Sequence, residues 1–231
     1  MANKILLVED EAPIRAFTRI NLEKEGYDIL EAETGERGIE IARAEHPAIV
    51  ILDLMLPGMD GYEVCSILRG EMPNIGIIML TAKSQEVDRI LGLEKGTDDY
   101  MVKPFNPHEL VLRVNSLKRR LNLQDEREHA SGKLQEGVFL LDRNARAFYK
   151  DGREMDLTPT ELAIVKLFLQ NPGKALSRED ILNQVWGTEY CGETKIVDVN
   201  IRRIRAKIED NPAKPQYLET VWGVGYRWKK S

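Results

Sequence analysis

The stretch VILDLMLPGMDGYEV, residues 50–64, decides the fold, because it joins a continuous apolar run to an amphipathic segment across one aspartate, Asp53. This apolar run belongs to a series of five, which occupy residues 4–8, 27–32, 48–53, 75–81 and 98–103. Amphipathic segments of helical period separate the runs, and another follows over residues 107–120. Short apolar runs that alternate with helices predict an α/β, doubly wound, five-stranded parallel sheet over residues 1–122.

The remainder of the chain has a different pattern. Residues 123–131 are charged and lack an apolar period, which predicts a linker. We expect a domain over residues 132–231 in which short strands turn at Asp151-Gly152, and in which Thr158-Pro159 and Ser177 begin helices. Helices are expected over residues 160–169, 178–186 and 194–208, with a hairpin over 217–228. Helix, turn, helix and terminal hairpin predict an α+β winged helix-turn-helix domain.

Composition sets limits on the class of protein. With 231 residues and 42% hydrophobic residues, the chain can bury the cores of two domains, and no apolar stretch approaches the length of a membrane span or a signal peptide. Cys65 and Cys191 lack the spacing of a metal site or a disulfide framework, so we expect a reducing cytoplasm. The net charge of -5 is uneven: residues 1–122 hold 15 Lys+Arg against 21 Asp+Glu, and residues 193–230 hold 9 against 5. The basic end is compatible with nucleic acid.

Polar residues gather where the apolar runs end. In an open parallel sheet, ligands bind beyond the carboxyl ends of the strands, and those ends here carry Glu9, Asp10, Asp53, Thr81 and Lys103. Three carboxylates at one place repel one another unless a cation is shared, and oxygen ligands favour a hard ion such as Mg²⁺. An acidic residue at one strand end is ordinarily a solvated turn, but the joint placement predicts a site. Asp53 is expected to attack phosphorus, with the lysine and the hydroxyl contacting the phosphoryl oxygens.

These residues lie in segments that resemble the receiver domains of two-component response regulators: KILLVEDE, VILDLMLPGMDGYEV, IIMLTA and GTDDYMVKPFNPHEL. The resemblance covers about the first 120 residues. It implies that Asp53 is the phosphoacceptor and receives its phosphoryl group from a phosphohistidine on a sensor kinase. Calling such a protein an enzyme would mislead, because it promotes only its own phosphorylation and dephosphorylation.

The same resemblance assigns the neighbouring side chains. It implies that Asp10, Asp53 and the backbone carbonyl of Met55 hold Mg²⁺ with Glu9 beside them. It further implies that Lys103 and Thr81 contact the phosphoryl group, that Tyr100 turns inward when Thr81 moves, and that Pro104 follows a cis peptide bond.

A rival from another class is the aspartyl-phosphate hydrolase, which also combines an aspartate nucleophile, Mg²⁺ and a parallel sheet. Those enzymes carry a second aspartate two residues after the nucleophile as acid and base, and this chain has Met55 there. The sequence therefore lacks the group that would drive rapid turnover.

Charged residues also mark the expected face of the fourth helix, fifth strand and fifth helix, where each taken alone would be solvated surface. The chain is similar throughout to the OmpR/PhoB subfamily, in which the corresponding residues pair across a symmetric receiver dimer. The resemblance implies three pairs in a phosphorylation-promoted homodimer: Arg89 with Glu109, Asp99 with Arg113, and Asp98 with Arg120.

The segment over residues 194–208 combines an apolar stripe with positive charge, so that one face can pack and another can meet DNA. The resemblance to the OmpR/PhoB effector domain rests on LTPTELAIVKLFLQNPGKALSREDILNQVWG, TKIVDVNIRRIRAKIE and YLETVWGVGYRW. It implies that this helix enters the major groove and that Arg227 reaches the minor groove. Bases would be nearest to Lys195, Val199, Asn200 and Arg203, and the DNA backbone nearest to Arg202 and Arg205. Trp222 stands where some relatives have arginine.

These expectations together describe a transcription factor that is switched by phosphorylation of Asp53 and binds promoter direct repeats as a dimer. The family resemblance implies that the loop over residues 187–192 can touch RNA polymerase. Three alternatives are weighed against this interpretation. The hydrolase is disfavoured by Met55, a stand-alone protein-interaction module by the basic C-terminal helix, and a DNA-binding protein without a switch by the complete pocket.

Overall fold

The computed structural model describes residues 3–82, 96–121 and 132–230. The chain divides into two compact units, Met1–Leu121 and Asn122–Ser231. The predicted linker, residues 123–131, lies outside the described residues. Among the helices that are described, none has the length and apolar character needed to cross a membrane.

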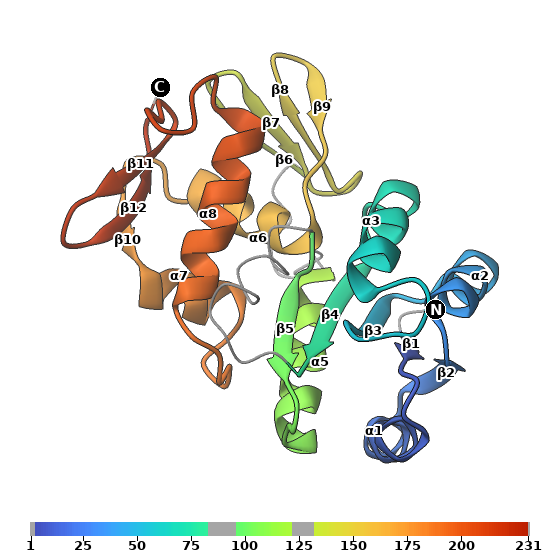
Figure 1. The fold of residues 1–231 in the computed structure, drawn as a ribbon. Helices are drawn as coiled ribbons and strands as arrows, with labels where there is room; N and C mark the ends of the chain where they lie inside the picture. The colour runs from blue at the N-terminus through green and yellow to red at the C-terminus, as the bar shows by residue number, and fades with distance from the viewer. Residues whose placement is uncertain (1–2, 83–95, 122–131, 231) are drawn as a thin grey trace. The chain divides into compact units, whose positions relative to one another are not determined.

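The first unit is built on a parallel sheet with the strand order β2-β1-β3-β4-β5, and it has the predicted α/β architecture (Figure 1). Its strands are β1 (Lys4–Val8), β2 (Asp28–Ala32), β3 (Ile49–Asp53), β4 (Gly76–Thr81) and β5 (Asp99–Val102). Its described helices are α1 (Ala12–Lys24), α2 (Gly35–Glu45), α3 (Gly61–Glu71) and α5 (Pro107–Leu121). The expected closing helix over residues 107–120 is therefore present as α5.

The central strands are apolar because both faces of the sheet are covered. Leu6 and Val50 point into one core with residues of α2 and α3, whereas Ile5 and Ile51 point into a second core with residues of α1 and α5. Burying each such side chain contributes roughly 1.5–3 kcal/mol. With both faces occupied by helices, polar groups are left to the ends of the strands.

A tight connection places α3 against the end of β3. Asp60 caps the helix through a capping box with Glu63. A Cβ atom on Gly61 would lie 2.3 Å from the carbonyl oxygen of Asp53, so only glycine allows this approach. The first residue of α3, Gly61, therefore packs directly against the backbone of Asp53.

The second unit opens with an antiparallel sheet of order β6-β7-β8-β9, formed by β6 (Lys133–Glu136), β7 (Phe139–Asp142), β8 (Ala147–Lys150) and β9 (Arg153–Met155). The predicted turn at Asp151-Gly152 joins β8 to β9, and both residues have positive φ values of 51° and 76°. Positive φ at both central residues is the requirement of a type I′ hairpin turn.

The helices of the second unit also agree with the predicted positions: α6 (Pro159–Leu169), α7 (Arg178–Val185) and α8 (Lys195–Ile208). Thr158 and Ser177, which were expected to begin helices, both form capping boxes at those positions. The predicted C-terminal hairpin is present as β11 (Leu218–Val221) and β12 (Gly225–Trp228). A strand that was not expected from the sequence, β10 (Ala175–Ser177), pairs with β12 in a sheet of order β10-β12-β11.

Candidate functional site

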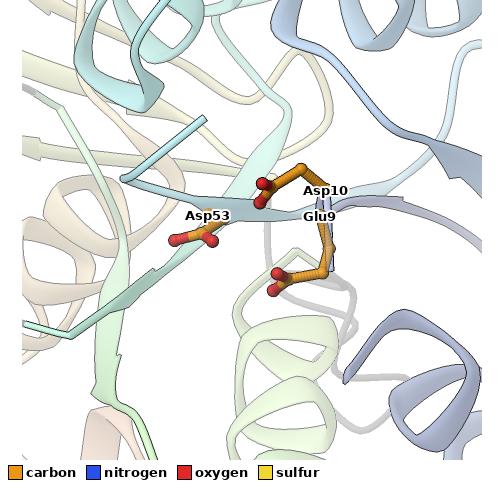
Figure 2. Close-up of side chains that lie close together, drawn as sticks. All are labelled: Glu9, Asp10 and Asp53. Carbon is orange, nitrogen blue, oxygen red and sulfur yellow. The ribbon is translucent and has the colours of Figure 1, made fainter. Parts of the chain in front are cut away.

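An acidic pocket lies at the carboxyl ends of β1 and β3. Glu9 and Asp10 follow β1 and Asp53 ends β3, and one oxygen from each carboxylate lies within 4.8 Å of the others. Figure 2 shows these three side chains gathered around one space. The convergence expected of the three carboxylates is therefore present.

Lys103 enters the same pocket from the segment that follows β5. Its Nζ lies 2.7 Å from Oδ2 of Asp53 and 2.9 Å from Oε1 of Glu9. The Lys103-Pro104 peptide bond is cis, as the resemblance implied. Glu9 is fully buried and Asp53 is 3% exposed, whereas Asp10 is exposed. The ammonium group thus bridges two buried carboxylates and leaves an excess of negative charge.

The buried groups perturb one another's proton affinity. The pKa of Glu9 is raised to about 7: burial is the largest cause, the hydrogen bond from Lys103 opposes it, and the negative charge of Asp53 adds to the rise. Burial alone would lower the pKa of Lys103, but its hydrogen bonds to Asp53 and Glu9 outweigh burial and raise it. Lys103 is therefore held as a cation beside Asp53.

The remaining predicted residues surround Asp53. The backbone N–H of Met55 donates to Oδ1 of Asp53 at 3.1 Å, while the Met55 side chain is 58% exposed. Thr81, which ends β4, is buried, and Tyr100 lies partly buried on β5. The role of the Met55 carbonyl as a metal ligand and the movement of Tyr100 stay predictions.

Arg15 on α1 is a positioning residue that the sequence analysis missed. Its guanidinium donates to the backbone carbonyl of Glu9 at 2.7 Å and to Glu33 at 2.6 Å. These bonds hold the turn that presents Glu9 and Asp10. No local pattern signals this contact, because an arginine on an amphipathic helix is ordinarily solvated.

The donor set of the pocket suits a hard divalent cation. Carboxylate oxygens converge from Glu9, Asp10 and Asp53, and the ammonium of Lys103 does not balance the charge of three carboxylates. Oxygen ligands of this kind are those that Mg²⁺ and Ca²⁺ prefer. Asp10, the exposed member, and Asp53 are the residues that would hold such an ion, with Glu9 beside them.

The second candidate surface is the exposed side of α8. Its most exposed members are Lys195, Arg202 and Ala206, with Asp198 and Arg205 half-buried. These positions recur every three to four residues, so they form one face of the helix. This face presents two cationic side chains to solvent.

Three of the predicted base contacts do not lie on that face, and the predicted set needs correction. Val199 is 7% exposed, Asn200 is fully buried and Arg203 is 8% exposed. Asn200 donates to the carbonyl of Ile196, and Nε of Arg203 lies 2.8 Å from the buried carboxylate of Glu161 on α6. The physical reason is periodicity, because residues 196, 199, 200 and 203 share the face of α8 that packs into the domain.

Two further predicted DNA contacts have partners within the hairpin. Arg205 donates to the carbonyl of Leu218 at 2.8 Å and to the hydroxyl of Thr220 at 2.9 Å, and so ties β11 to α8. Arg227 pairs with Glu219 on the neighbouring strand at 2.9 Å. The Arg227 side chain is 43% exposed, and its contact with the minor groove stays a prediction.

A cluster that the sequence analysis missed connects α7, α8 and β12. Asp198 accepts hydrogen bonds from Arg178 and from the hydroxyl of Tyr226, both at 2.7 Å. Burial and the Asp198 carboxylate raise the pKa of Tyr226 to about 12, so its hydroxyl remains a donor. The cluster fixes the hairpin against the first turn of α8. Tertiary packing alone creates it, since its members are far apart in the sequence.

Comparison with known proteins agrees with this architecture. Residues 5–115 match the family described as the response regulator receiver domain, and residues 152–228 match the family described as the C-terminal domain of transcriptional regulatory proteins. DrrB of Thermotoga maritima, described as an OmpR/PhoB homolog, is 33% identical over 99% of this chain and 100% of its own, with a TM-score of 0.53. This chain is an OmpR/PhoB-type response regulator.

Other solved response regulators resemble it over different extents. A mutant form of RitR is 26% identical over 99% of this chain and 100% of its own, with a TM-score of 0.82. The receiver domain of the Francisella response regulator 1452 is 33% identical over 51% of this chain and 98% of its own, with a TM-score of 0.50. The likeness to full-length regulators therefore includes both units of this chain.

The face expected to form the response-regulator dimer carries charges that already have partners within one chain. Asp98 pairs with Arg69 of α3 at 2.8 Å, and Asp99 pairs with Arg113 at 2.7 Å. Arg113 also contacts Glu109 at 2.6 Å. Both aspartates are fully buried and Arg113 is 6% exposed. The expectation of solvated surface charges is therefore wrong for these three residues.

Two predicted members of the dimer pairs remain. Arg120 is 3% exposed and donates to the hydroxyl of Ser116 at 3.1 Å, and Arg89 lies outside the described residues. A dimer that pairs Asp99 with Arg113 across two chains would exchange an existing internal ion pair for an intermolecular one. Arg69 donates both to Asp98 and to the carbonyl of Gly96, and this role was not predicted from the sequence.

Proposed function

We propose that this response regulator is a phosphorylation-switched transcription factor in which Asp53 receives a phosphoryl group from a sensor histidine kinase. The observation that carries the proposal is the position of Asp53, whose carboxylate lies 2.7 Å from the Lys103 ammonium beside two further carboxylates. A buried carboxylate that faces a fixed cation and an acidic cluster is suited to attack an electrophilic phosphorus atom.

The residues of the pocket divide the work of phosphoryl transfer. A carboxylate oxygen of Asp53 forms a bond to phosphorus while the bond from phosphorus to the kinase imidazole nitrogen breaks, and the imidazole leaves with the electron pair. Lys103 neutralises charge on the phosphoryl oxygens because its hydrogen-bond partners keep it protonated. The Thr81 hydroxyl, at the end of the neighbouring strand, donates to one phosphoryl oxygen.

We assign the cation of the pocket as Mg²⁺, held by Asp10, Asp53 and the Met55 carbonyl with Glu9 beside them. When bound, such an ion neutralises phosphoryl oxygens and fixes their orientation. Among the described residues of the pocket, carboxylates outnumber ammonium groups, and this supports the assignment.

The output is DNA binding by the second unit. Its exposed face on α8 carries Lys195 and Arg202 and suits contacts to phosphates and base edges in the major groove. We propose that phosphorylation promotes a receiver dimer, which places two such domains on direct repeats about 10–11 bp apart. The loop over residues 187–192 is proposed to contact RNA polymerase. Because promoter DNA is its target, the protein is proposed to act in the cytoplasm.

We propose that the receiver is not a turnover enzyme. Met55 occupies the position from which a hydrolase would present a second aspartate, and its exposed thioether can neither accept nor donate a catalytic proton. A long-lived phosphoryl group on Asp53 is the expected consequence. A stand-alone interaction module is less suitable, because it would give the cationic face of α8 no role.

The deciding experiment compares the wild type with Asp53→Ala, each incubated with Mg²⁺ and acetyl phosphate. We expect only the wild type to incorporate phosphate, to dimerise in sedimentation and to bind promoter DNA more tightly. Asp28→Ala, which removes an exposed aspartate at the start of β2, is the matched control and should behave like the wild type. If Asp53→Ala responds as the wild type does, the switch does not act through Asp53.

A further inference from the structure

Arg15 on α1 connects the turn that carries Asp10 to the end of the neighbouring strand β2. Its Nη1 atom donates to the backbone carbonyls of Glu9 at 2.7 Å and of Asp10 at 3.2 Å. Its Nη2 atom donates to the carboxylate of Glu33 at 2.6 Å, and its Nε atom lies 3.5 Å from the carboxylate of Glu31. One guanidinium therefore links the ends of two paired strands, and its planar fork of donors suits such a divided contact.

This contact replaces a conventional cap at the start of α1. The N-cap residue, Glu11, makes no side-chain capping hydrogen bond. Arg15 instead reaches back one turn to the two carbonyls that precede the cap. The Arg15 side chain is 12% exposed, so the hydrogen bonds lie in a region of low dielectric, where they are stronger than in water. The path of the chain between β1 and α1 therefore depends on Arg15.

Asp10 depends on this contact more than Glu9 does. The Glu9 carboxylate is buried and is also held by Lys103 at 2.9 Å and by the backbone N–H of Glu11 at 3.3 Å. Asp10 is exposed, so the direction of its carboxylate follows chiefly from the backbone of the turn. Figure 2 shows Asp10 directly after Glu9, with its carboxylate turned toward Asp53.

We infer that Arg15 is a positioning residue for divalent-cation binding, whose forked contact with the backbone directs the Asp10 carboxylate into the pocket. The inference rests on the proposed function, in which the pocket holds Mg²⁺, and it adds a residue outside the ligand set that determines the affinity for the ion. Removing a group that orients a metal ligand in this way typically weakens metal binding by about 10–100-fold.

The charge of Arg15 allows positioning to be distinguished from a general electrostatic effect. A guanidinium beside the pocket repels a second cation, so its charge alone weakens Mg²⁺ binding. If charge were its only influence, removing Arg15 would tighten Mg²⁺ binding. If Arg15 positions Asp10, removing it weakens Mg²⁺ binding. The two roles therefore predict changes of opposite sign.

The first test measures the Mg²⁺ dissociation constant of the full-length protein without a phosphodonor. Urea unfolding is followed by far-ultraviolet circular dichroism at increasing Mg²⁺ concentration, and the rise in the free energy of unfolding gives the dissociation constant. Arg15→Ala should bind Mg²⁺ about tenfold more weakly than the wild type. Arg19→Ala is the matched control, because this arginine of α1 pairs with Glu23 and Glu31, and its affinity should stay unchanged. Equal or tighter binding by Arg15→Ala overturns the inference.

Two further variants test the route from Arg15 to the ion. Arg15→Lys keeps the positive charge but lacks the planar fork, so its Mg²⁺ affinity should lie between those of the wild type and Arg15→Ala. Wild-type affinity in Arg15→Lys overturns the inference, and this variant still gives an answer if Arg15→Ala does not fold. Adding Arg15→Ala to Asp10→Asn should cause no further loss of affinity, because Arg15 acts through Asp10. An additive loss also overturns the inference.

A kinetic measurement separates positioning from general damage to the pocket. With acetyl phosphate as donor, the Mg²⁺ concentration that gives half the maximal rate of phosphate incorporation should rise about tenfold in Arg15→Ala. The rate at saturating Mg²⁺ should stay within about twofold of the wild type, because Asp53 and Lys103 are unchanged. A lower maximal rate with an unchanged dependence on Mg²⁺ would indicate damage to the fold and overturn the inference.

The outcomes separate this inference from the function on which it rests. If the wild type takes up no phosphate but Arg15→Ala weakens Mg²⁺ binding, the proposed phosphoacceptor role of Asp53 fails and the role of Arg15 stands. If the wild type is phosphorylated and Arg15→Ala keeps wild-type Mg²⁺ affinity, the role of Arg15 fails and the phosphoacceptor stands. A wild type that does not bind Mg²⁺ refutes both the assignment of the ion and the role of Arg15.

Discussion

The acidic pocket of the first unit and the exposed face of α8 in the second were predicted from the same sequence, with different success. Asp53, Glu9 and Lys103 converge as their strand ends required, whereas Asn200 and Arg203 turned out to be buried. A parallel sheet brings all its carboxyl ends to one edge, so the order of strands is enough to place the pocket. A helix has a continuous surface, and its solvent face depends on what packs against it.

The largest effect is expected at the charged face of the first unit, where residues predicted to be on the surface are also buried. Arg113→Glu would place a carboxylate beside the fully buried Asp99 and remove its ion pair. We expect this substitution to destabilise the first unit by about 3–5 kcal/mol, because a buried charge loses its partner. Urea unfolding of the full-length protein, followed by far-ultraviolet circular dichroism, measures the change.

Glu109→Gln is the matched control for Arg113→Glu. Glu109 contacts the same guanidinium, but its side chain is 33% exposed, so its loss should cost at most about 1 kcal/mol. If Arg113→Glu folds as stably as Glu109→Gln, the internal pair with Asp99 carries little energy. Arg113 could then serve the dimer alone.

A second pair of variants tests the corrected face of α8. Arg203→Ala should destabilise the second unit by about 3 kcal/mol, because the buried carboxylate of Glu161 would keep only Lys207 as a cationic partner. Arg202→Ala changes an exposed side chain, so stability should remain within about 0.5 kcal/mol while DNA affinity falls. Tryptophan fluorescence in urea follows this unit alone, since all three tryptophans lie in it.

Equal losses of stability in Arg203→Ala and Arg202→Ala would show that Arg203 lies on the solvent face. That result would support the set of base contacts first predicted from the sequence. A folded Arg203→Ala protein that loses base preference would do the same. Because the two arginines are adjacent and chemically identical, the comparison isolates burial from residue type.

These two surfaces show which part of a site a sequence can reveal. Thr158 and Ser177 were predicted to begin helices from residues close to them in sequence, Pro159 directly after Thr158 and Asp180 three residues after Ser177. Asp60 was missed, although Glu63 stands at the same spacing and could have revealed it. The contact of Arg69 with Asp98 joins residues 29 positions apart, and no local pattern records it. Interactions between residues close in sequence could therefore be predicted. Contacts between distant residues could be predicted only where the order of strands in the sheet dictated them.

The metal-binding capacity of the pocket gives the third prediction. Mg²⁺ at about 100 times its dissociation constant should stabilise the first unit by about 2.7 kcal/mol, because the ion binds the folded pocket and not the unfolded chain. Removing the ion with a chelator should reverse the gain. Circular dichroism in urea, with and without Mg²⁺, measures it without any phosphodonor.

Asp10→Asn tests whether the stabilisation comes from the pocket. It removes the exposed carboxylate of the cluster and should abolish most of the gain from Mg²⁺, whereas Asp28→Asn at the opposite end of the sheet should retain it. If Mg²⁺ still stabilises Asp10→Asn, the ion binds elsewhere. The argument that the three converging carboxylates form its site would then be weakened.

The smallest expected effects compare one local feature in two environments. Asp60 and Thr158 each cap a helix through a capping box, but Asp60 is exposed whereas Thr158 is 2% exposed. Loss of a cap costs about 0.5–2 kcal/mol. We expect Asp60→Ala to cost about 1 kcal/mol, because water can replace the lost acceptor, and Thr158→Ala to cost about 2 kcal/mol, because water cannot.

The partner residue strengthens this expectation for Thr158. Its capping partner Glu161 accepts the Thr158 backbone N–H at 2.8 Å and also binds Arg203 and Lys207. A loosened cap would therefore disturb the contact between α6 and α8, and Thr158→Ser, which keeps the hydroxyl, should restore most of the stability. Equal costs for Asp60→Ala and Thr158→Ala would mean that the cap acts only within its own helix. A larger cost for Thr158→Ala would mean that this locally predictable cap also supports the face of α8 that sequence alone placed incorrectly.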